Sequence, residues 1–158
     1  MLRPLTARDW FTSIRGKVVK LGRMEDRVRD LQEQTGITGQ GFDAIGHSPG
    51  PKDTDSRVLA AIHAQAQFER YRAALCLELE SASAVLYGWD NRGGLAKVRC
   101  SADADCVCGY YLQALTWRQV AEEMVKPDSK DGPQWCKRRA YRSLELIDRL
   151  GIAYLQNI

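Results

Sequence analysis

Hydrophobic residues near the start of the chain recur at spacings of three and four, which predicts a helix with one narrow, coiled-coil-like apolar seam. The residues of this seam are Ala7, Trp10, Ile14, Leu21, Met24, Val28 and Leu31. Lys17 interrupts the series. The helix is expected to run from Thr6 to about Gln34, and its seam needs a partner to be buried.

A second apolar series follows a connection, residues 35–52, that contains five glycines and two prolines and therefore predicts a loop. The next helix is expected to begin near residues 53–55 and to end at about Tyr87. Its early apolar stripe is Leu59, Ile62 and Ala66, and its later stripe is Phe68, Leu75, Leu79, Ala82 and Leu86. Antiparallel pairing with the first helix would bury both stripes. Pairing between two chains, as in a homodimer, would hide the same residues, so the sequence leaves both arrangements open.

Start and stop signals place shorter helices in the C-terminal part. Gly88 and the paired glycines of WDNRGG predict a turn. Short helices are then expected over residues 95–99 and 101–112. Thr116, with Gln119 three residues later, has the pattern of a capping box that starts a further helix. That helix must stop by Lys126, because Pro127 disfavours helical geometry in the residue before it.

A polar turn over residues 128–132 precedes a last helix, which Asp131 can cap and which tolerates Pro133 in its first turn. Its inner face would hold Cys136, Ala140, Ser143, Leu144, Ile147 and Leu150. Its outer face would hold Gln134, Trp135, Arg138 and Arg142, flanked by Lys137, Arg139 and Tyr141. No acidic residue lies between Pro133 and Leu144. Two helices joined by a short polar turn, the second apolar inside and basic outside, are the helix-turn-helix pattern for entry into the major groove of DNA.

Together these elements predict an all-α fold with two domains. Residues 1–90 would form a long N-terminal helical hairpin, antiparallel and coiled-coil-like, around the loop 35–52. Residues 91–158 would form a C-terminal three-helix helix-turn-helix domain that binds DNA.

The run from Asp105 to Leu146 carries Tyr110, Tyr111, Leu115, Thr116, Trp117, Val120, Ala121, Ala140 and Leu144 in a characteristic order. This order resembles region four of bacterial sigma factors, with its tyrosine-containing helix, LTWxxVA-like helix and recognition helix. The whole chain is similar to the small phage-encoded transcriptional regulators of the ArpU and RinA type from prophages of Gram-positive bacteria. Its run MVKPDSKDGP is longer than the usual turn of those relatives. The resemblance implies activation of prophage late genes, with RNA polymerase as a partner.

Composition and charge exclude only some classes of protein. The chain has 158 residues, of which 44% are hydrophobic, and this suffices for a packed core. A net charge of +3 is too modest to indicate a nucleic-acid partner by itself, so only the positions of the charges can indicate one. No apolar run approaches the roughly 18 residues of a membrane span, and the start lacks the hydrophobic centre of a secretion signal. A cytoplasmic protein with no membrane partner is expected.

The chemistry-bearing residues give no pattern of a catalytic or metal site. The cysteines are Cys76, Cys100, Cys106, Cys108 and Cys136, an odd number that favours reduced thiols over disulfides. No C-x-x-C pair exists, and His47 and His63 lie far upstream, so no metal is expected. The chain also lacks a paired-carboxylate motif and a nucleotide-binding loop. Neither an enzyme nor a cofactor is therefore predicted.

The leading interpretation is a sequence-specific DNA-binding transcriptional regulator that binds double-stranded DNA. Gln134, Arg138 and Arg142 would read bases. The other residues of the predicted interface are Thr116, Trp117, Arg118, Trp135, Lys137, Arg139 and Tyr141, with Thr116, Arg118, Lys137 and Arg139 assigned to phosphates. A basic helix face can also be ordinary solvated surface. The rival function is a phage packaging or assembly factor in which the long helices oligomerise and the basic helix binds DNA or a protein partner.

Overall fold

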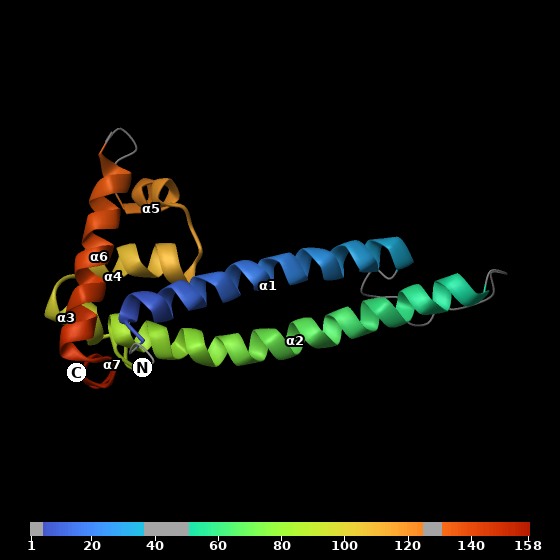
Figure 1. Cartoon of the computed structure of the whole chain (residues 1–158), viewed down its shortest axis with the longest axis horizontal. Coiled ribbons are helices and arrows are strands. Elements are labelled where there is room, and N and C mark those ends of the chain that lie inside the picture. Colours follow the sequence, from blue (N-terminus) through green and yellow to red (C-terminus); the bar gives the residue numbers. More distant parts are fainter. Residues whose placement is uncertain (1–4, 37–50, 125–130) are drawn as a thin grey trace. The chain divides into compact units, whose positions relative to one another are not determined.

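The computed structural model describes residues 5–36, 51–124 and 131–158. All regular secondary structure in these ranges is helical, which confirms the predicted all-α class (Figure 1). The elements are α1 (Ala7–Thr35), α2 (Pro51–Tyr87), α3 (Gly94–Val98), α4 (Ser101–Val107), the π-helical turn η2 (Cys108–Leu112), α5 (Trp117–Met124), α6 (Gly132–Leu150) and α7 (Ile152–Gln156). No helix in the same ranges is both long and apolar enough to cross a membrane. Most of the predicted loop 35–52 lies outside the described residues.

The described residues divide into two compact units, and the division does not follow the predicted boundary after residue 90. One unit combines Met1–Val18 with Leu75–Ile158, and the other is Val19–Ala74. Burial is the physical reason. Phe11 near the start of α1 and Leu86 near the end of α2 are fully buried in the same core as residues of α4, α5 and α6. The start of α1 and the end of α2 therefore belong to the same, larger unit as α4, α5 and α6.

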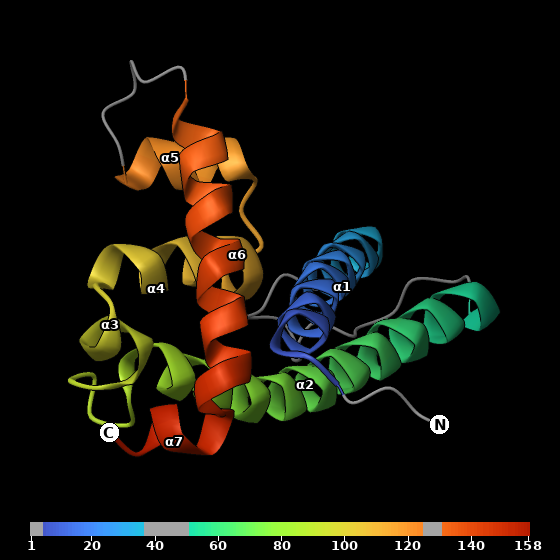
Figure 2. The ribbon, with the colours of Figure 1, turned by 60° about the vertical axis from the view of Figure 1, so that its left-hand side comes forward.

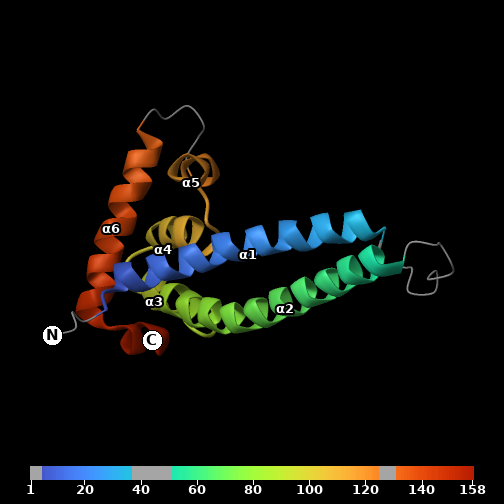
Figure 3. The ribbon, with the colours of Figure 1, turned by 45° about the vertical axis from the view of Figure 1, so that its right-hand side comes forward.

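Within Val19–Ala74, α1 and α2 lie side by side and run in opposite directions (Figure 3). The Lys20 Nζ lies 4.8 Å from the centre of the Tyr71 ring. Farther along α1, the side-chain amide of Gln32 donates a hydrogen bond to Gln65 Oε1 at 3.4 Å. Later residues of α1 thus meet earlier residues of α2, which defines an antiparallel pair.

The prediction that pairing buries the early apolar stripe of α2 is wrong. Leu59 is 57% exposed and Ile62 is 44% exposed, whereas Ala61 is buried. Apolar residues occupy two opposite sides of this part of α2, and spacing alone does not tell which side meets α1. The later stripe is confirmed, because Leu75 and Leu86 are buried.

The larger unit is built around α6, against which α4 and α5 pack (Figure 2). Its fully buried side chains include Phe11, Ile14, Leu86, Leu95, Val107, Val120, Leu144, Ile147 and Leu155. The seam pattern on α1 selects Trp10, yet it is the neighbouring Phe11 that is fully buried. The centre of the Phe11 ring lies 5.1 Å from the ring centre of Trp10 and 5.9 Å from that of Tyr111. Lys17, which interrupts the seam, pairs with Glu78 at 2.6 Å.

The turn predicted after α2 is confirmed, and its paired glycines are required by close backbone contacts. Gly94 has a φ of +62°, and a Cβ there would lie 2.6 Å from the Tyr87 backbone nitrogen. A Cβ on Gly93 would lie 1.9 Å from the Ile158 carbonyl oxygen. Neither position has room for a side chain, so these glycines determine how the chain leaves α2.

Candidate nucleic-acid interface

The start of α5 follows the predicted capping box. The backbone N–H of Gln119 donates to Thr116 Oγ1 at 3.3 Å, and the backbone N–H of Thr116 donates to Gln119 Oε1 at 2.9 Å. Two backbone donors at the helix start are thereby satisfied. Val120 and Ala121 are then buried in the core. The predicted helix stop at Lys126 and the first half of the predicted turn lie outside the described residues.

The inner face of α6 is confirmed, but its predicted cap is not. Cys136, Ala140, Ser143, Leu144 and Ile147 are buried, and Leu150 is half-buried. Asp131 occupies the N-cap position without a side-chain hydrogen bond to the helix, so the expected capping by its carboxylate is absent. Gly151 ends the helix with a φ of +88°, and its N–H donates to the Ile147 carbonyl oxygen at 2.8 Å.

The outer face of α6 presents Gln134, Arg138 and Arg142 at intervals of four residues, and all three are exposed. This spacing places them on one side of a helix. No ion pair in the described part of the chain involves Arg138 or Arg142. Trp135, in the first turn, is 39% exposed. The structure therefore brings the predicted base-reading residues together on an open surface.

Arg139 has a different environment from the one expected. Its Nη1 lies 3.1 Å from Oδ1 of Asp103, which is buried on α4 and also pairs with Arg99 at 3.3 Å. The Asp103 Oδ1 contact is an ion pair without hydrogen-bond geometry. The Arg139 guanidinium also lies 4.2 Å from the centre of the Trp135 ring. Arg139 thus joins α6 to α4 and supports Trp135, and the phosphate contact predicted for it has no support in this geometry.

The role of Asp103 is not predictable from the sequence, because a carboxylate far upstream gives no local sign of its partner on α6. Replacing Asp103 with alanine is expected to lower the free energy of unfolding by about 2 to 3 kcal/mol, since two arginines lose their buried partner. Urea denaturation measures this. The matched control is Glu122→Ala, which removes an exposed carboxylate 3.1 Å from Arg118 and should change stability by less than about 0.5 kcal/mol. Equal effects of the two substitutions would contradict the structural role of Asp103.

Trp117 and Tyr141 belong to an aromatic cluster inside the larger unit. The Trp117 ring stacks on Tyr110 with ring centres 3.9 Å apart and planes within 4°, and it meets Tyr141 edge-on at 6.3 Å. The Arg15 guanidinium lies 3.8 Å from the centre of the Tyr110 ring. Arg8 likewise lies 4.5 Å from the centre of the Tyr141 ring. Both predicted interface aromatics therefore contribute to packing between α1, α5 and α6.

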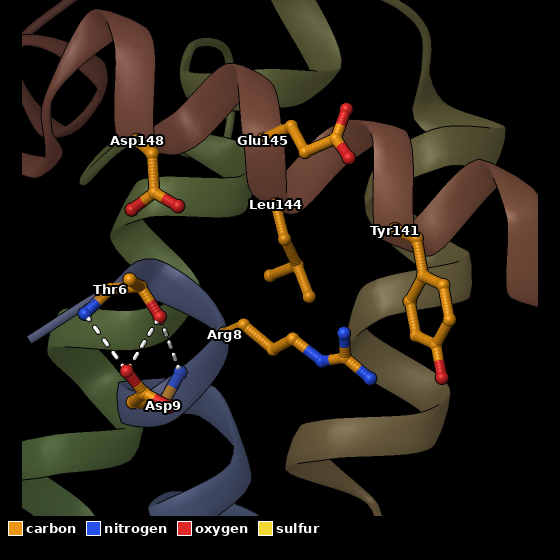
Figure 4. A pocket seen from close by; sticks show the side chains of 7 residues that line it. All are labelled: Thr6, Arg8, Asp9, Tyr141, Leu144, Glu145 and Asp148. Carbon is orange, nitrogen blue, oxygen red and sulfur yellow. Dashed lines mark hydrogen bonds between the residues drawn. The ribbon is translucent and has the colours of Figure 1, made fainter.

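A cavity of about 470 Å³ lies where the start of α1 meets α6 (Figure 4). Thr6, Arg8, Asp9, Tyr141, Leu144, Glu145 and Asp148 line it. The Ala7 N–H donates to Asp148 Oδ1 at 2.6 Å, and Thr6 and Asp9 form a reciprocal cap. Three carboxylates against one arginine make this lining unsuitable for phosphate. The cavity is therefore a feature of the packing between the start of α1 and α6.

Two thiols of the larger unit, those of Cys106 and Cys136, are buried. Burial raises the pKa of the Cys106 thiol and of the Cys136 thiol, so both are protonated at neutral pH and are poor nucleophiles. Cys106 Sγ lies 3.7 Å from Met124 Sδ, whereas Cys100 Sγ accepts from Arg139 at 3.6 Å. In the described ranges no three His, Cys, Asp or Glu side chains are grouped to hold a metal ion.

Comparison of the chain with protein-family models, with curated proteins and with solved structures found no match. The geometry of α5 and α6 is therefore the main guide to function.

Proposed function

We propose that the chain is a sequence-specific DNA-binding transcriptional regulator, in which α5 and α6 act as a helix-turn-helix and α6 is the recognition helix. The outer face of α6 carries the proposal. Gln134, Arg138 and Arg142 are exposed on one side, and the two arginines have no ion-pair partner in the described residues. α4 and α5 pack on the helix from behind, as the supporting helices of a groove-binding helix do.

The side chains on this face suit direct readout of bases. An arginine can donate two hydrogen bonds to O6 and N7 of guanine, and a glutamine can pair with N6 and N7 of adenine. Gln134 lies nearest the start of the helix, followed by Arg138 and then Arg142. Recognition helices contact bases mainly through their N-terminal residues, so Gln134 and Arg138 are assigned to base edges and Arg142 to the groove margin.

Other polar and charged groups are assigned to positioning the protein on the DNA backbone. The side chain of Arg118 on α5 is 84% exposed and forms an ion pair with Glu122. Lys137 is half-buried, with its Nζ 5.7 Å from the centre of the Tyr141 ring. Both cations, with the Thr116 hydroxyl, are assigned to phosphates, which fix orientation without reading sequence.

The likeness of residues 105–146 to region four of bacterial sigma factors supports the same proposal and extends it. We assign the chain to the phage-encoded regulators of the ArpU and RinA type, acting in the cytoplasm on prophage late genes together with RNA polymerase. The Thr116 and Gln119 cap and the buried Val120, Ala121, Ala140 and Leu144 agree with that pattern.

One observation favours a packaging or assembly factor as the second candidate. Leu59 and Ile62 are exposed on α2, as expected for a helix that oligomerises. Oligomer size separates the candidates, because a monomer or dimer fits a regulator and a closed ring of many subunits fits packaging.

Footprinting on DNA from the gene's own neighbourhood, repeated at several salt concentrations, tests the proposal. Wild-type protein is expected to protect a defined site, and its affinity should fall steeply with salt. Lys137→Ala should weaken binding to all sequences alike and reduce the slope of log K against log salt by about 1. The control is Lys97→Ala, which removes an exposed lysine from α3. A sequence-independent footprint would refute specific recognition.

A further inference from the structure

Trp135 is the one large apolar side chain of α6, residues 132–150, that is exposed rather than buried or half-buried. It lies in the first turn of the helix. At about 100° per residue, it lies about 60° from Arg138 and about 20° from Arg142 around the helix axis. Trp135 therefore belongs to the face that is proposed to contact DNA.

The Trp135 ring is held in place by a chain of charged groups. The Arg139 guanidinium, one turn later in α6, lies 4.2 Å from the centre of the ring. The Arg139 Nη1 atom lies 3.1 Å from Oδ1 of Asp103, which is buried on α4, and Arg99 Nε donates to the other carboxylate oxygen at 3.3 Å. Because this pairing leaves the Arg139 guanidinium few alternative positions, it also restricts the ring. A restricted ring loses little side-chain entropy on binding.

A fixed apolar ring in the major groove of DNA has one complementary group on the bases. The base edges present hydrogen-bond donors and acceptors there, and the one apolar group among them is the C5-methyl of thymine. Gln134 and Arg138 suit the polar groups, whereas the ring carbons of Trp135 suit the methyl group. Recognition helices contact bases mainly through their N-terminal residues, and Trp135 lies between Gln134 and Arg138 in the sequence.

We propose that Trp135 recognises the C5-methyl group of one thymine in the DNA site, and that Arg139, paired with Asp103, positions the Trp135 ring for this contact. The inference rests on the proposed DNA-binding function and adds a specificity-determining residue to it. The thymine is expected next to the bases that Gln134 and Arg138 contact, because the three residues lie within about one helical turn. Arg139 acts through Trp135 and does not itself contact DNA.

An exposed tryptophan can also be the anchor of a protein interface. The surroundings of Trp135 favour DNA, because it lies on the same side of α6 as Arg138 and Arg142, and neither arginine has an ion-pair partner in the part of the chain that the structure describes. A protein partner would be indifferent to a methyl group on a base, so the two occupants give different results in the test below.

Replacing thymine with deoxyuridine tests the methyl contact directly. The footprinted site is synthesised with each thymine replaced in turn, which removes the C5-methyl and leaves the O4 acceptor and the base pair intact. Wild-type protein is expected to lose affinity about three- to fivefold at one thymine, the effect of burying one methyl group, and to bind the other substituted sites normally. Trp135→Ala should bind the thymine and deoxyuridine sites equally. Fluorescence anisotropy with labelled duplexes measures these affinities.

Conservative variants separate recognition from folding. Trp135→Phe keeps an apolar ring and should keep the preference for thymine. Arg139→Lys keeps a positive charge beside Asp103 but lacks the planar group that lies against the ring, so the preference should fall below about twofold. The matched control is Trp89→Ala, which removes an exposed tryptophan that lies outside α6 and should leave affinity and preference unchanged. Circular dichroism checks that each variant keeps its helix content.

One thymine whose methyl matters to the wild-type protein and not to Trp135→Ala establishes the contact. A defined footprint that tolerates deoxyuridine at every position, or a preference that Trp135→Ala retains, overturns the inference and leaves specific DNA binding intact. An unchanged preference in Arg139→Lys overturns the positioning role of Arg139. A footprint without sequence preference instead refutes the proposed function, and this inference with it.

Discussion

Replacing Arg138 with alanine is expected to weaken binding to the specific DNA site by about 1 to 3 kcal/mol, a loss of roughly fivefold to 150-fold. Arg138 is exposed in the middle of the face on which Gln134 and Arg142 also lie. Because a bidentate contact to guanine distinguishes that base from the others, the variant should also lose its preference at one base position. Affinity for unrelated DNA should change much less.

The measurement is a competition binding assay at fixed salt, in which each position of the footprinted site is changed in turn. Arg149→Ala is a matched control. Arg149 is also exposed on α6 and points to nearly the same side as Arg142, but it lies seven residues, or about 10 Å, farther from the helix start. Its loss should leave base preference intact. If Arg138→Ala weakens binding to every sequence equally, Arg138 contacts phosphate and the base assignment is wrong.

Much of the fold is predictable because its signals are local. The capping box at Thr116 and Gln119 determines where α5 begins, and Gly151 determines where α6 ends. The inner face of α6 follows from spacing alone, since Cys136 and Ala140 recur at a helical interval. These features depend on residues within one or two turns of each other.

The predictions that fail depend on contacts between distant segments. Arg139 looks like its basic neighbours in the sequence, and only the packing of α4 on α6 brings Asp103 to 3.1 Å from it. Leu59 and Ile62 have the spacing of a buried stripe, but α1 contacts the other side of α2. Periodicity identifies an apolar face without identifying the surface that covers it.

The division of the chain into two compact units also depends on contacts between distant segments. A long uninterrupted helix gives no sign that its first turns belong to a different unit from its last. The apolar seam of α1 has members on both sides of the division between Val18 and Val19. The adjacent aromatics Trp10 and Phe11 also make it harder to assign the buried face of α1, because either residue can satisfy a spacing of three or four.

Replacing Phe11 with alanine is therefore expected to destabilise the unit that contains α6, although Phe11 lies more than a hundred residues upstream. The side chain is fully buried and contacts the rings of Trp10 and Tyr111. Truncation of a buried phenylalanine costs about 3 to 5 kcal/mol, which is a large part of the total stability of a small domain. Urea denaturation should show this loss. Thr12→Ala, at the exposed neighbouring position, should change stability by less than about 0.5 kcal/mol.

Hydrogen exchange shows where the destabilisation acts. If the first turns of α1 are part of the core around α6, Phe11→Ala must increase the exchange rate of amides in α6 as well as in α1, because these amides open with the unit to which they belong. A DNA-binding domain confined to residues 91–158 would keep its α6 protection in the same variant. Unchanged protection of α6, alongside a measurable loss in α1, would show that α6 folds without the N-terminal segment and would support the predicted boundary after residue 90.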